Sequence, residues 1–394
     1  MYVTRPLSMY RRSPSTLSIP PPDAPYSGYL VITDEEAEAE DACCWRLFRR
    51  KRVKKLPFPQ DKIFSITHGS EYEQTSNTKV WFLPVPDHPL SSNRYYVIRA
   101  KGRNKGKACK SSREGDIVSC CFTDLLNDKG PKPFSLKDLY QIFKIHSHQS
   151  GGFFAKSIAP DGIPPSFLRK KGWRIQISGS YKSCRLREAL GVDAPLREKL
   201  PDFNFPISRK NSPPVVVGNW YCPFIFVREG SAKARHQMKK SMFYSMRLEQ
   251  RWEEIYSCGS DESEGDVDVV VVNVLVEREV VRVSGMEASK SGRTDANGFF
   301  WFRAYNPYTR RRANVGLSSA IFEHMRWVEE QGGWAHGHGK ERMVRVREEV
   351  RSQTQWVRFG CYVLVESFCL RTLDGKLVLR YDFRHTHHVK FKWE

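Results

Sequence analysis

The chain has 394 residues, of which 40% are hydrophobic and 12% aromatic, enough for one large core or for two cores of ordinary size. It carries 64 Lys and Arg against 44 Asp and Glu, and the net charge of +20 favours an anionic partner: nucleic acid, an anionic membrane surface or an acidic protein. No apolar run approaches the roughly 18 residues of a spanning helix, and the first residues lack the apolar stretch of a signal peptide, so we expect neither a transmembrane segment nor secretion.

The ten cysteines are scattered along the chain and form no Cys-x-x-Cys pair. Paired spacings are typical of zinc sites, and a disulfide framework is typical of small secreted domains. We therefore interpret the cysteines as reduced thiols in a cytoplasmic protein, with a peripheral membrane location or a nuclear location as the alternatives. We predict no cofactor and no metal ion.

The first part of the chain is predicted to be a mobile, partly disordered arm over residues 1–55. Residues 1–27 are rich in Pro and Ser, with three consecutive prolines at 20–22, a composition typical of an extended segment. Residues 29–32 are a short strand candidate. A charged stretch follows, and the two prolines of LPFPQ at 56–60 end it.

The segment DEEAEAEDACCWRLFRRKRVKK, residues 34–55, places two adjacent cysteines between an acidic run and a basic run. A dozen flexible residues span about 19 Å on average, more than the Debye length of about 8 Å at physiological salt. The basic half can therefore meet a charged surface while the acidic half points away. Its seven basic side chains are Arg46, Arg49, Arg50, Lys51, Arg52, Lys54 and Lys55.

Three interpretations of this segment remain open. The basic half can bind an anionic membrane surface, and an acyl chain on Cys43 or Cys44 would supply the second signal that stable anchoring requires. The basic half can instead be a nuclear-import signal, since short basic runs also have that role. The segment can also be a solvated loop with internal ion pairs. In each case we expect residues 34–55 to lie outside the packed core, because most of them are charged.

Residues 56–210 are predicted to form a first β-rich domain. One helix is expected to begin at Ser135, which starts a Ser-x-x-Asp capping box with Asp138. The rest of the domain alternates turn residues with short runs of β-type residues, at 79–83, 95–100, 116–122, 153–158 and 173–178.

Residues 211–394 are predicted to form a second β-rich domain after the linker candidate SRKNSPP at 208–214. The valine-rich run at 269–276 is interpreted as a buried strand. A helix is expected over residues 317–329, because apolar residues repeat there at helical spacing.

The stretch SCGSDESEGD, residues 257–266, is predicted to be an exposed acidic loop. Ser263 precedes Glu264 and Asp266, a context that suits an acid-directed kinase. We therefore predict Ser263 to be a phosphorylation site.

The carboxyl-terminal stretch CYVLVESFCLRTLDGKLVLRYDFRHTH alternates on both sides of Asp374-Gly375, a pair favoured in two-residue type I′ turns. These two residues are therefore predicted to be the centre of a hairpin turn. The opposed residues on one face of that hairpin would be Leu370 with Leu379, Phe368 with Tyr381, Glu366 with Phe383, Leu364 with His385, and Tyr362 with His387.

This hairpin carries the candidate catalytic or metal-binding residues. His385 and His387 would project from one face, with Glu366 diagonal to His385. Two imidazoles and a carboxylate can hold a metal ion or transfer a proton. The alternative is a polar group at the edge of a sheet whose hydrogen bonds are satisfied within the fold. The chain has no GxGxxG, GxxxxGK[ST], HExxH or GxSxG motif that would indicate a reaction.

Basic residues also gather at Lys101–Lys110 and at Arg310-Arg311-Arg312, which follow Tyr305 and Tyr308. Phosphate binding needs such groups on one surface. The chain has no helix-turn-helix, zinc-finger or RNP-type signature, so no specific nucleic acid is expected. Non-specific, salt-sensitive nucleic-acid binding by a nuclear protein remains an alternative.

A series of motifs in fixed order resembles the plant proteins grouped as domain of unknown function 1262. The resemblance covers nearly the whole chain. It implies a plant protein and no activity, because the family has no assigned catalytic residues to carry over. The motifs are MYVTRPLSMYRRSPSTLSIPPP, SGYLVITDEEAEAEDACC, LPFPQ, PLSSNRYYVIRAKGRNKGKA, GIPPSFLRKKGW, LPDFNFP, PPVVVGNWYCPF, MFYSMRLEQRWEEIY, RFGCYVLVESF and YDFRHTHHVKFKWE.

We therefore expect an α+β protein, predominantly antiparallel β, with two β-rich domains, a few helices and a mobile amino-terminal arm. The expected function is that of a non-catalytic binding or scaffold protein, soluble or peripherally attached to a membrane through the basic segment. The alternative is an enzyme or a metal-binding protein that uses Glu366, His385 and His387. An enzyme requires these residues to converge in a concave pocket with a further polar group, whereas a scaffold does not.

Overall fold

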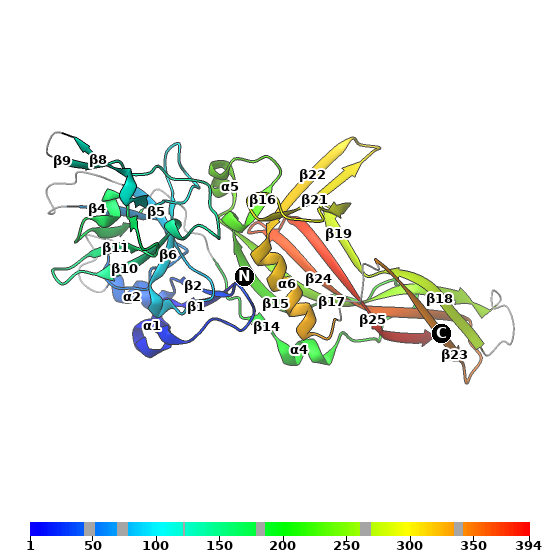
Figure 1. The fold of residues 1–394 in the computed structure, drawn as a ribbon. Helices are drawn as coiled ribbons and strands as arrows, with labels where there is room; N and C mark the ends of the chain where they lie inside the picture. Colours follow the sequence, from blue (N-terminus) through cyan, green and yellow to red (C-terminus); the bar gives the residue numbers. More distant parts are fainter. Residues whose placement is uncertain (43–51, 69–77, 121–122, 179–185, 261–268, 335–341) are drawn as a thin grey trace.

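The computed structural model describes the chain except for residues 43–51, 69–77, 121–122, 179–185, 261–268 and 335–341. Most of the described chain forms β-sheets, and the prediction of an α+β protein with predominantly antiparallel strands is confirmed. A smaller sheet from the amino-terminal half lies at one end of the molecule, and the long strands of the carboxyl-terminal half extend away from it (Figure 1).

The larger sheet has 12 strands within the described residues. Its centre consists of three long strands, of which the middle one is buried along nearly its whole length. Such continuous burial indicates that both faces of the sheet are covered there. The order is β16 (Val227–Glu229), β22 (Arg311–Ser318), β21 (Phe299–Asn306), β20 (Met286–Lys290), β19 (Glu279–Val283), β25 (Leu377–Trp393), β24 (Arg358–Thr372), β17 (Phe243–Gly259), β15 (Val215–Pro223), β1 (Tyr2–Pro6) and β2 (Gly28–Ile32), with β14 (Gly191–Val192) paired to β15.

The smaller sheet has seven strands and its own aromatic core. Phe82 stacks on Trp173 with ring centroids 6.2 Å apart, and Phe58 lies 4.7 Å from Phe82. Aromatic pairs at these distances stabilise a core beyond the area that they bury. The order is β11 (Phe153–Ser157), β10 (Ile142–Ser147), β6 (Arg94–Arg99), β5 (Thr78–Pro84), β4 (Phe64–Thr67), β13 (Arg174–Ile177) and β3 (Arg52–Val53).

Strand β5 joins the two sheets, because its side chains alternate between two cores. Phe82 faces the core of the smaller sheet, whereas Trp81 packs with residues that border the larger sheet. The Trp81 ring lies 6.1 Å from Phe224 and 5.3 Å from Phe243. The main core thus contains residues of both β-rich units, and the aromatic core of the smaller sheet lies on the other face of β5.

The chain passes from the larger to the smaller sheet between Ile32 and Arg52, and returns to the larger sheet between Ile177 and Gly191. The linker candidate at 208–214 is packed against β17, since the Ser212 N–H donates to the Trp252 carbonyl at 2.9 Å and the Ser212 hydroxyl accepts from the Trp252 N–H. The domain limits at residues 55 and 210 remain predictions.

The prediction of a mobile arm is wrong for the described part of residues 1–55. Strand β1 pairs in parallel with β2 and antiparallel with β15, so the first residues lie inside the larger sheet. Tyr2 and Val3 are buried. The Pro and Ser content obscured the short run YV of β1, whose aromatic and β-branched residues suit a strand. The strand expected at 29–32 is confirmed as β2.

Two helices, α1 (Leu7–Arg12) and α2 (Glu35–Ala42), follow β1 and β2. Ala37 of α2 is buried in the main core, which contradicts the expectation that residues 34–55 lie outside it. The acidic residues of α2 form ion pairs with bases elsewhere: Glu40 with Arg11 at 2.8 Å, Glu36 with Arg12 at 3.4 Å, and Glu38 with Lys62 at 3.4 Å.

The carboxyl-terminal hairpin keeps four predicted pairs but not the predicted turn. Three residues, 373–375, form the loop, because the Thr372 N–H donates to the Lys376 carbonyl at 3.0 Å and the Gly375 N–H donates to the Thr372 carbonyl at 2.9 Å. Gly375 has φ 90, a left-handed conformation that suits glycine. A bulge at Val378 restores the register. The confirmed pairs are Leu370 with Leu379, Phe368 with Tyr381, Glu366 with Phe383, and Leu364 with His385.

A second irregularity lies further along this hairpin. Leu364 pairs with His385, but Val363 pairs with Val389, so residues 386–388 have no partner on β24. Tyr362 consequently faces Lys390, and the prediction that it faces His387 is wrong.

Two other predicted elements differ in outcome. The expected helix over 317–329 is confirmed as α6 (Ser319–Gln331), which the Ser318 hydroxyl caps. The helix expected at Ser135 is wrong: Asp138 caps only the short 3₁₀ turn η4 (Leu139–Gln141), and β10 begins directly after it.

The valine-rich run forms β18 (Val269–Glu277), paired with β23 (Met343–Arg351) in a separate two-stranded sheet. The strand is confirmed, but its residues alternate between buried and more exposed positions, so the interpretation as a buried strand holds only for the face of Val270, Val272 and Val276. The other elements are η1 (Pro14–Ser18), η2 (Leu90–Ser92), β7 (Ser112–Arg113), η3 (Glu114–Asp116), β8 (Ile117–Cys120), β9 (Thr123–Leu126), β12 (Gly162–Ile163), α3 (Ser166–Arg169), α4 (Ala194–Lys199), η5 (Phe224–Phe226) and α5 (Ala234–Lys240). Among the helices described, none is both long enough and apolar enough to cross a bilayer.

Removing the Tyr2 side chain should destabilise the fold. The ring is buried 6.2 Å from Phe226, and the hydroxyl donates to the Pro84 carbonyl at 2.8 Å. We expect Tyr2→Ala to lower the free energy of unfolding in urea by about 3–5 kcal/mol. Tyr308→Ala is the control, because Tyr308 is 95% exposed and should change stability by no more than about 0.5 kcal/mol. If both variants lowered the free energy of unfolding by the same small amount, the amino terminus would not be packed in the core.

Candidate functional site

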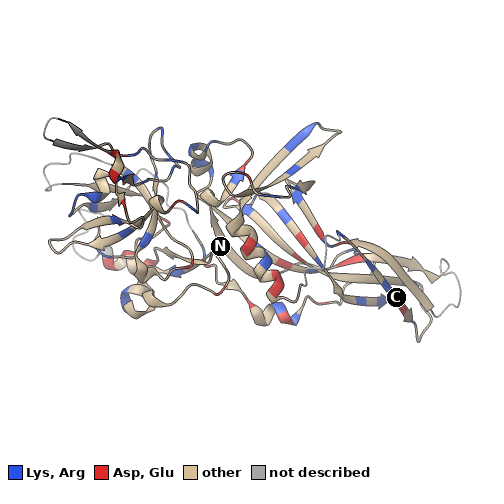
Figure 2. Ribbon diagram, viewed as in Figure 1, with Lys and Arg blue, Asp and Glu red and all other residues tan. Residues whose placement is uncertain are grey.

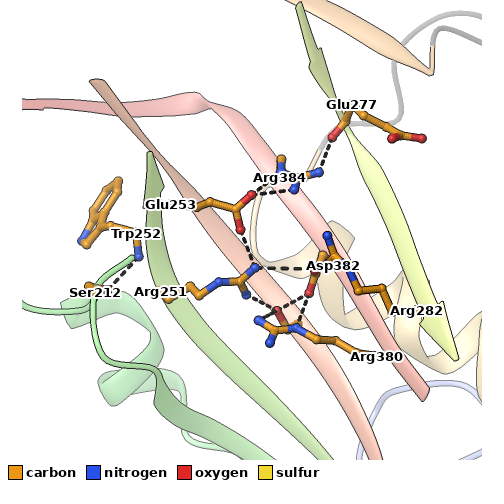
Figure 3. Close-up of polar contacts among 10 residues, drawn as sticks. Ser212, Arg251, Trp252, Glu253, Glu277, Arg282, Arg380, Asp382 and Arg384 are labelled. Carbon is orange, nitrogen blue, oxygen red and sulfur yellow. Dashed lines mark hydrogen bonds and ion pairs between the residues drawn. The ribbon is translucent and has the colours of Figure 1, made fainter. Parts of the chain in front are cut away.

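A network of arginines and carboxylates lies on one face of the long strands (Figure 3). Residues two apart on a strand share a face, so alternate residues of β17 and of β25 project from the same face of the sheet. Strand β24 lies between them and adds a serine, and β19 adds an arginine at the other edge of β25. The members are Arg251, Glu253, Arg282, Ser367, Arg380, Asp382 and Arg384.

Asp382 is the centre of this network and is fully buried. Its carboxylate accepts hydrogen bonds from the Ser367 hydroxyl at 2.6 Å, Arg380 Nε at 2.8 Å and Arg282 Nη1 at 2.8 Å, and Arg251 Nη2 lies 3.5 Å away. Burial by itself would raise the pKa of Asp382, but the charges of Arg251 and Arg380 hold it below its ordinary value. Asp382 is therefore ionised at neutral pH.

Glu253 is the second carboxylate. It accepts from Arg251 Nη2 at 2.5 Å and from Arg384 at 3.0 Å through Nε and 2.5 Å through Nη2. Burial would raise the pKa of Glu253, yet the charges of Arg251 and Arg384 lower it. The four arginines of this network face its two carboxylates, which leaves a surplus of two positive charges, four minus two.

An open cavity of about 540 Å³, which we call the arginine pocket, lies over this network. Arg282 and Arg380 keep 38% and 27% of their side chains exposed, so they remain accessible beside the pocket. Within the described chain, the Lys210 ammonium forms no ion pair. The lining residues are Lys210, Asn211, Arg251, Glu253, Glu254, Arg282, Gly285, Leu377 and Arg380.

The lining suits anion binding better than bond-making chemistry. Guanidinium groups bind carboxylates and phosphates through paired, charge-assisted hydrogen bonds. Four bases face two acids, so the lining itself has a net charge of +2, four minus two. It contains no serine, cysteine or histidine to serve as nucleophile or proton shuttle, and two arginines hold Glu253 ionised.

The predicted group of Glu366, His385 and His387 is assembled only in part. His385 Nε2 lies 3.2 Å from Glu366 Oε2 and 3.1 Å from Glu329 Oε2. His385 and Glu366 are each 1% exposed. His387 falls in the stretch without strand partners, is exposed, and has its ring centroid 5.6 Å from that of His385. The arginine pocket is lined by other residues.

Sequence reasoning missed the buried partners of Glu366. Arg197 of α4 donates Nε to Glu366 Oε1 at 2.8 Å, and its Nη2 also donates to Oε2. Arg197 Nη1 donates to the Val328 carbonyl of α6 at 2.8 Å, and Gln250 donates to Glu366 Oε1 at 2.8 Å. These partners are distant in the chain, and no local spacing pattern connects them to the hairpin.

Three residues of this buried cluster could hold a metal ion. Glu329, Glu366 and His385 each offer one ligand atom, and these atoms lie within 4.8 Å of one another. The Arg197 guanidinium already occupies both oxygens of Glu366. A cation bound there would have to displace this guanidinium or accept it as a close neighbour.

The cluster shifts the proton affinities of its members. Burial, together with the charge of Glu366, raises the pKa of Glu329. Burial would lower the pKa of His385, but its contacts with Glu329 and Glu366 raise it. Burial would raise the pKa of Glu366, but its bonds with Arg197 and His385 lower it. Arg197 thus balances Glu366, and the raised pKa values of Glu329 and His385 favour the protonated form of both groups at neutral pH.

Most residues of the predicted membrane or import segment lie outside the described residues: Cys43, Cys44, Arg46, Arg49, Arg50 and Lys51. Arg52 lies in β3, and Lys54 and Lys55 are exposed. Ser263 also lies outside the described residues. The accessibility of these sites stays a prediction.

The structure defines an antiparallel β-rich protein with a charged pocket on its larger sheet. Residues 23–122 match the model of the family described as "Protein of unknown function (DUF1262)", which confirms the resemblance to that family. Plant origin stays a prediction.

Comparison with solved structures gives a weaker likeness. The protein titled "Crystal structure of Cry35Ab1" matches with a TM-score of 0.44 and 12% identity, over 85% of this chain and 90% of that chain. A likeness of this size carries no argument about function. No curated protein matches the sequence.

Gly332→Ala should destabilise the protein through Arg197. Gly332 ends α6 with φ −83, which any residue can adopt, but an added Cβ would overlap the Arg197 guanidinium. We expect urea unfolding to show a loss of about 1–3 kcal/mol. In Gly292→Ala the added Cβ meets no atom within 4 Å, so this control should stay within about 0.5 kcal/mol of the parent. Identical stabilities would mean that Arg197 moves freely.

Glu329→Gln should flatten the dependence of stability on pH. The raised pKa values of Glu329 and His385 mean that the folded state binds more protons than the unfolded state as pH rises above about 6.5, the ordinary histidine value. The stability contributed by His385 is therefore present below that pH and is lost toward alkaline pH, by up to about 1.4 kcal/mol per pH unit for each proton.

The measurement is urea unfolding of the parent and Glu329→Gln between pH 6 and pH 9. The variant removes one titrating group and one partner of His385, so its stability should fall less steeply. Glu198→Gln, on the exposed side of α4, is the matched control and should follow the parent. The same slope in all three proteins would rule out raised pKa values at Glu329 and His385.

Proposed function

We propose that this protein is a non-catalytic binding protein whose arginine pocket holds a small ligand with carboxylate or phosphate groups. The observation that carries the proposal is the surplus of basic side chains around an open cavity of about 540 Å³. That volume is in the range of small-ligand sites, roughly 300–1,000 Å³. Two surplus charges at a partly buried surface would favour an anion that supplies the missing carboxylates.

The network also orients its arginines before any ligand arrives. Arg380 donates hydrogen bonds to Asp382 and Ser367, and Arg282 donates through Nη1 to Asp382. Among the described residues, no other partner of the Arg282 guanidinium is recorded, so its remaining N–H groups can face a ligand. A guanidinium that is already fixed loses less conformational entropy on binding, which favours affinity.

The enzyme alternative has less support. Glu366 and His385 are buried among ion-pair partners, and Arg197 already occupies the Glu366 carboxylate. A binding role needs only the pocket, whereas catalysis would need these groups in contact with a substrate.

The basic segment at 46–55 remains a proposed contact with an anionic membrane surface. Its support is that Arg11, Arg12 and Lys62 pair with the acids of α2, which leaves fewer acids to neutralise the bases of the segment. A cytoplasmic protein with peripheral membrane contact, and acylation at Cys43 or Cys44, are proposed with it. Nuclear import and non-specific nucleic-acid binding are the alternatives that the same segment allows.

Calorimetric titration with inorganic pyrophosphate and with citrate tests the pocket. In the double variant Lys210→Gln with Arg282→Gln, we expect affinity for a bound probe to fall at least tenfold, since charge-assisted hydrogen bonds contribute about 1.5–3 kcal/mol each. The control is Arg345→Gln with Arg347→Gln, which removes the same charge from exposed positions of β23.

Two outcomes would contradict the pocket. One is that neither probe binds the parent at low salt. The other is that both double variants bind as the parent does, or weaken by the same factor, because the effect would then come from overall charge. Urea unfolding of each variant separates loss of binding from loss of fold.

A further inference from the structure

A second concentration of positive charge lies at the free end of the hairpin formed by β21 and β22. This hairpin projects from the larger sheet, and Figure 2 shows basic residues on β22 near its free end. Residues 299–318 contain four arginines and no acid. We call the exposed residues at this end the hairpin tip: Arg303, Tyr305, Tyr308, Arg310, Arg311 and Arg312.

The hairpin changes character along its length. Near its base, Phe302, Ala304 and Val315 are buried in the main core. Toward the free end, Tyr305 is 54% exposed and Tyr308 is 95% exposed. The core therefore accounts for the apolar residues of the hairpin, but packing does not account for two tyrosines among arginines in solvent.

The tip is held in a defined shape. Asn306 Oδ1 accepts hydrogen bonds from the N–H groups of Tyr308 and Thr309, both at 3.0 Å, which closes the turn. Tyr305 pairs across the strands with Arg312, whose guanidinium carbon lies 5.5 Å from the ring centroid. Tyr308 is thus presented outward, with the arginines beside it.

We propose that the hairpin tip binds an anionic membrane surface. Arginines can bind lipid phosphates and the carboxylates of phosphatidylserine, while tyrosine rings sit at the boundary between headgroups and hydrocarbon. A projecting end can meet a flat bilayer without interference from the rest of the sheet. This contact is separate from the arginine pocket and from residues 46–55, so it stands or falls independently of both.

Nucleic acid is the less favoured partner for this shape. The cations gather at one projecting end, whereas phosphate binding along a strand requires them to be spread over a surface. Arg312 lies over the ring of Tyr305, so Tyr308 is the one fully exposed ring of the tip, whereas binding along a nucleic-acid strand uses several successive rings.

The test is co-sedimentation with phosphatidylcholine vesicles that contain phosphatidylserine, with pure phosphatidylcholine vesicles as reference. Replacing Arg310, Arg311 and Arg312 together by Ala should lower partitioning roughly a hundredfold, because each basic group near an anionic leaflet contributes roughly fivefold. Tyr308→Ser should lower it a few-fold and should leave a weaker residual contact at high salt. The matched control replaces Arg345, Arg347 and Arg351 of β23 by Ala, with the same loss of charge.

The outcomes decide between the surfaces. Selective loss in the tip variant supports the proposal. No binding by the parent, equal loss in both triple variants, or full binding by the tip variant would overturn it. Full binding by the tip variant, together with loss when Arg49, Arg50, Lys51 and Arg52 are changed to Glu, would assign the contact to the basic segment. Loss of single-stranded RNA binding in the tip variant, with vesicle binding unchanged, would assign the tip to nucleic acid.

Discussion

The pairing of Arg197 with Glu366 is the constraint on which the centre of the larger sheet depends. Both side chains are buried, and an unpaired charge in that position would be strongly destabilising. The guanidinium also reaches the carbonyl of Val328, so a single side chain connects α4, α6 and β24. Gly332 leaves the space that this guanidinium fills. The need to pair the buried Glu366 carboxylate with Arg197 therefore fixes where α4 and the end of α6 lie on the sheet.

The alternation of the long strands separates two electrostatic environments. On β25, Asp382 lies on the face of the arginine network, whereas Phe383 and His385 lie on the opposite face. On β24, Ser367 lies on the face of the network and its neighbour Glu366 on the opposite face. A shift of one residue in either strand would exchange these faces and leave several charges unpaired. The bulge at Val378 corrects the register before Leu379 and so preserves this division.

The sequence predicted those elements that depend on the pattern of neighbouring residues. Alternation along the carboxyl-terminal hairpin was sufficient to pair Leu370 with Leu379, but the preference of Asp-Gly for two-residue turns did not reveal a loop that begins at Leu373. Composition misplaced the amino terminus, because Tyr2 is ordered by β2 and β15 and not by its own neighbours. The buried cluster and the arginine network depend on residues that are far apart in the sequence: Arg197 and Glu366 are separated by 169 positions, and Arg251 and Asp382 by 131.

A net charge of +20 does not by itself locate a function, because the fold pairs many of its bases with acids and leaves the surplus unevenly distributed. In the buried cluster, Arg197 is matched by Glu366, and at the amino terminus Arg11 is matched by Glu40. Charge can act on a partner only where carboxylates are too few. That condition holds in the arginine pocket, where four bases line the cavity with two acids, and at the hairpin tip, where four arginines have no acid on their own hairpin. Strands β19 and β20 lie between β25 and β21, so both surpluses belong to one hydrogen-bonded sheet and are fixed relative to each other by its backbone.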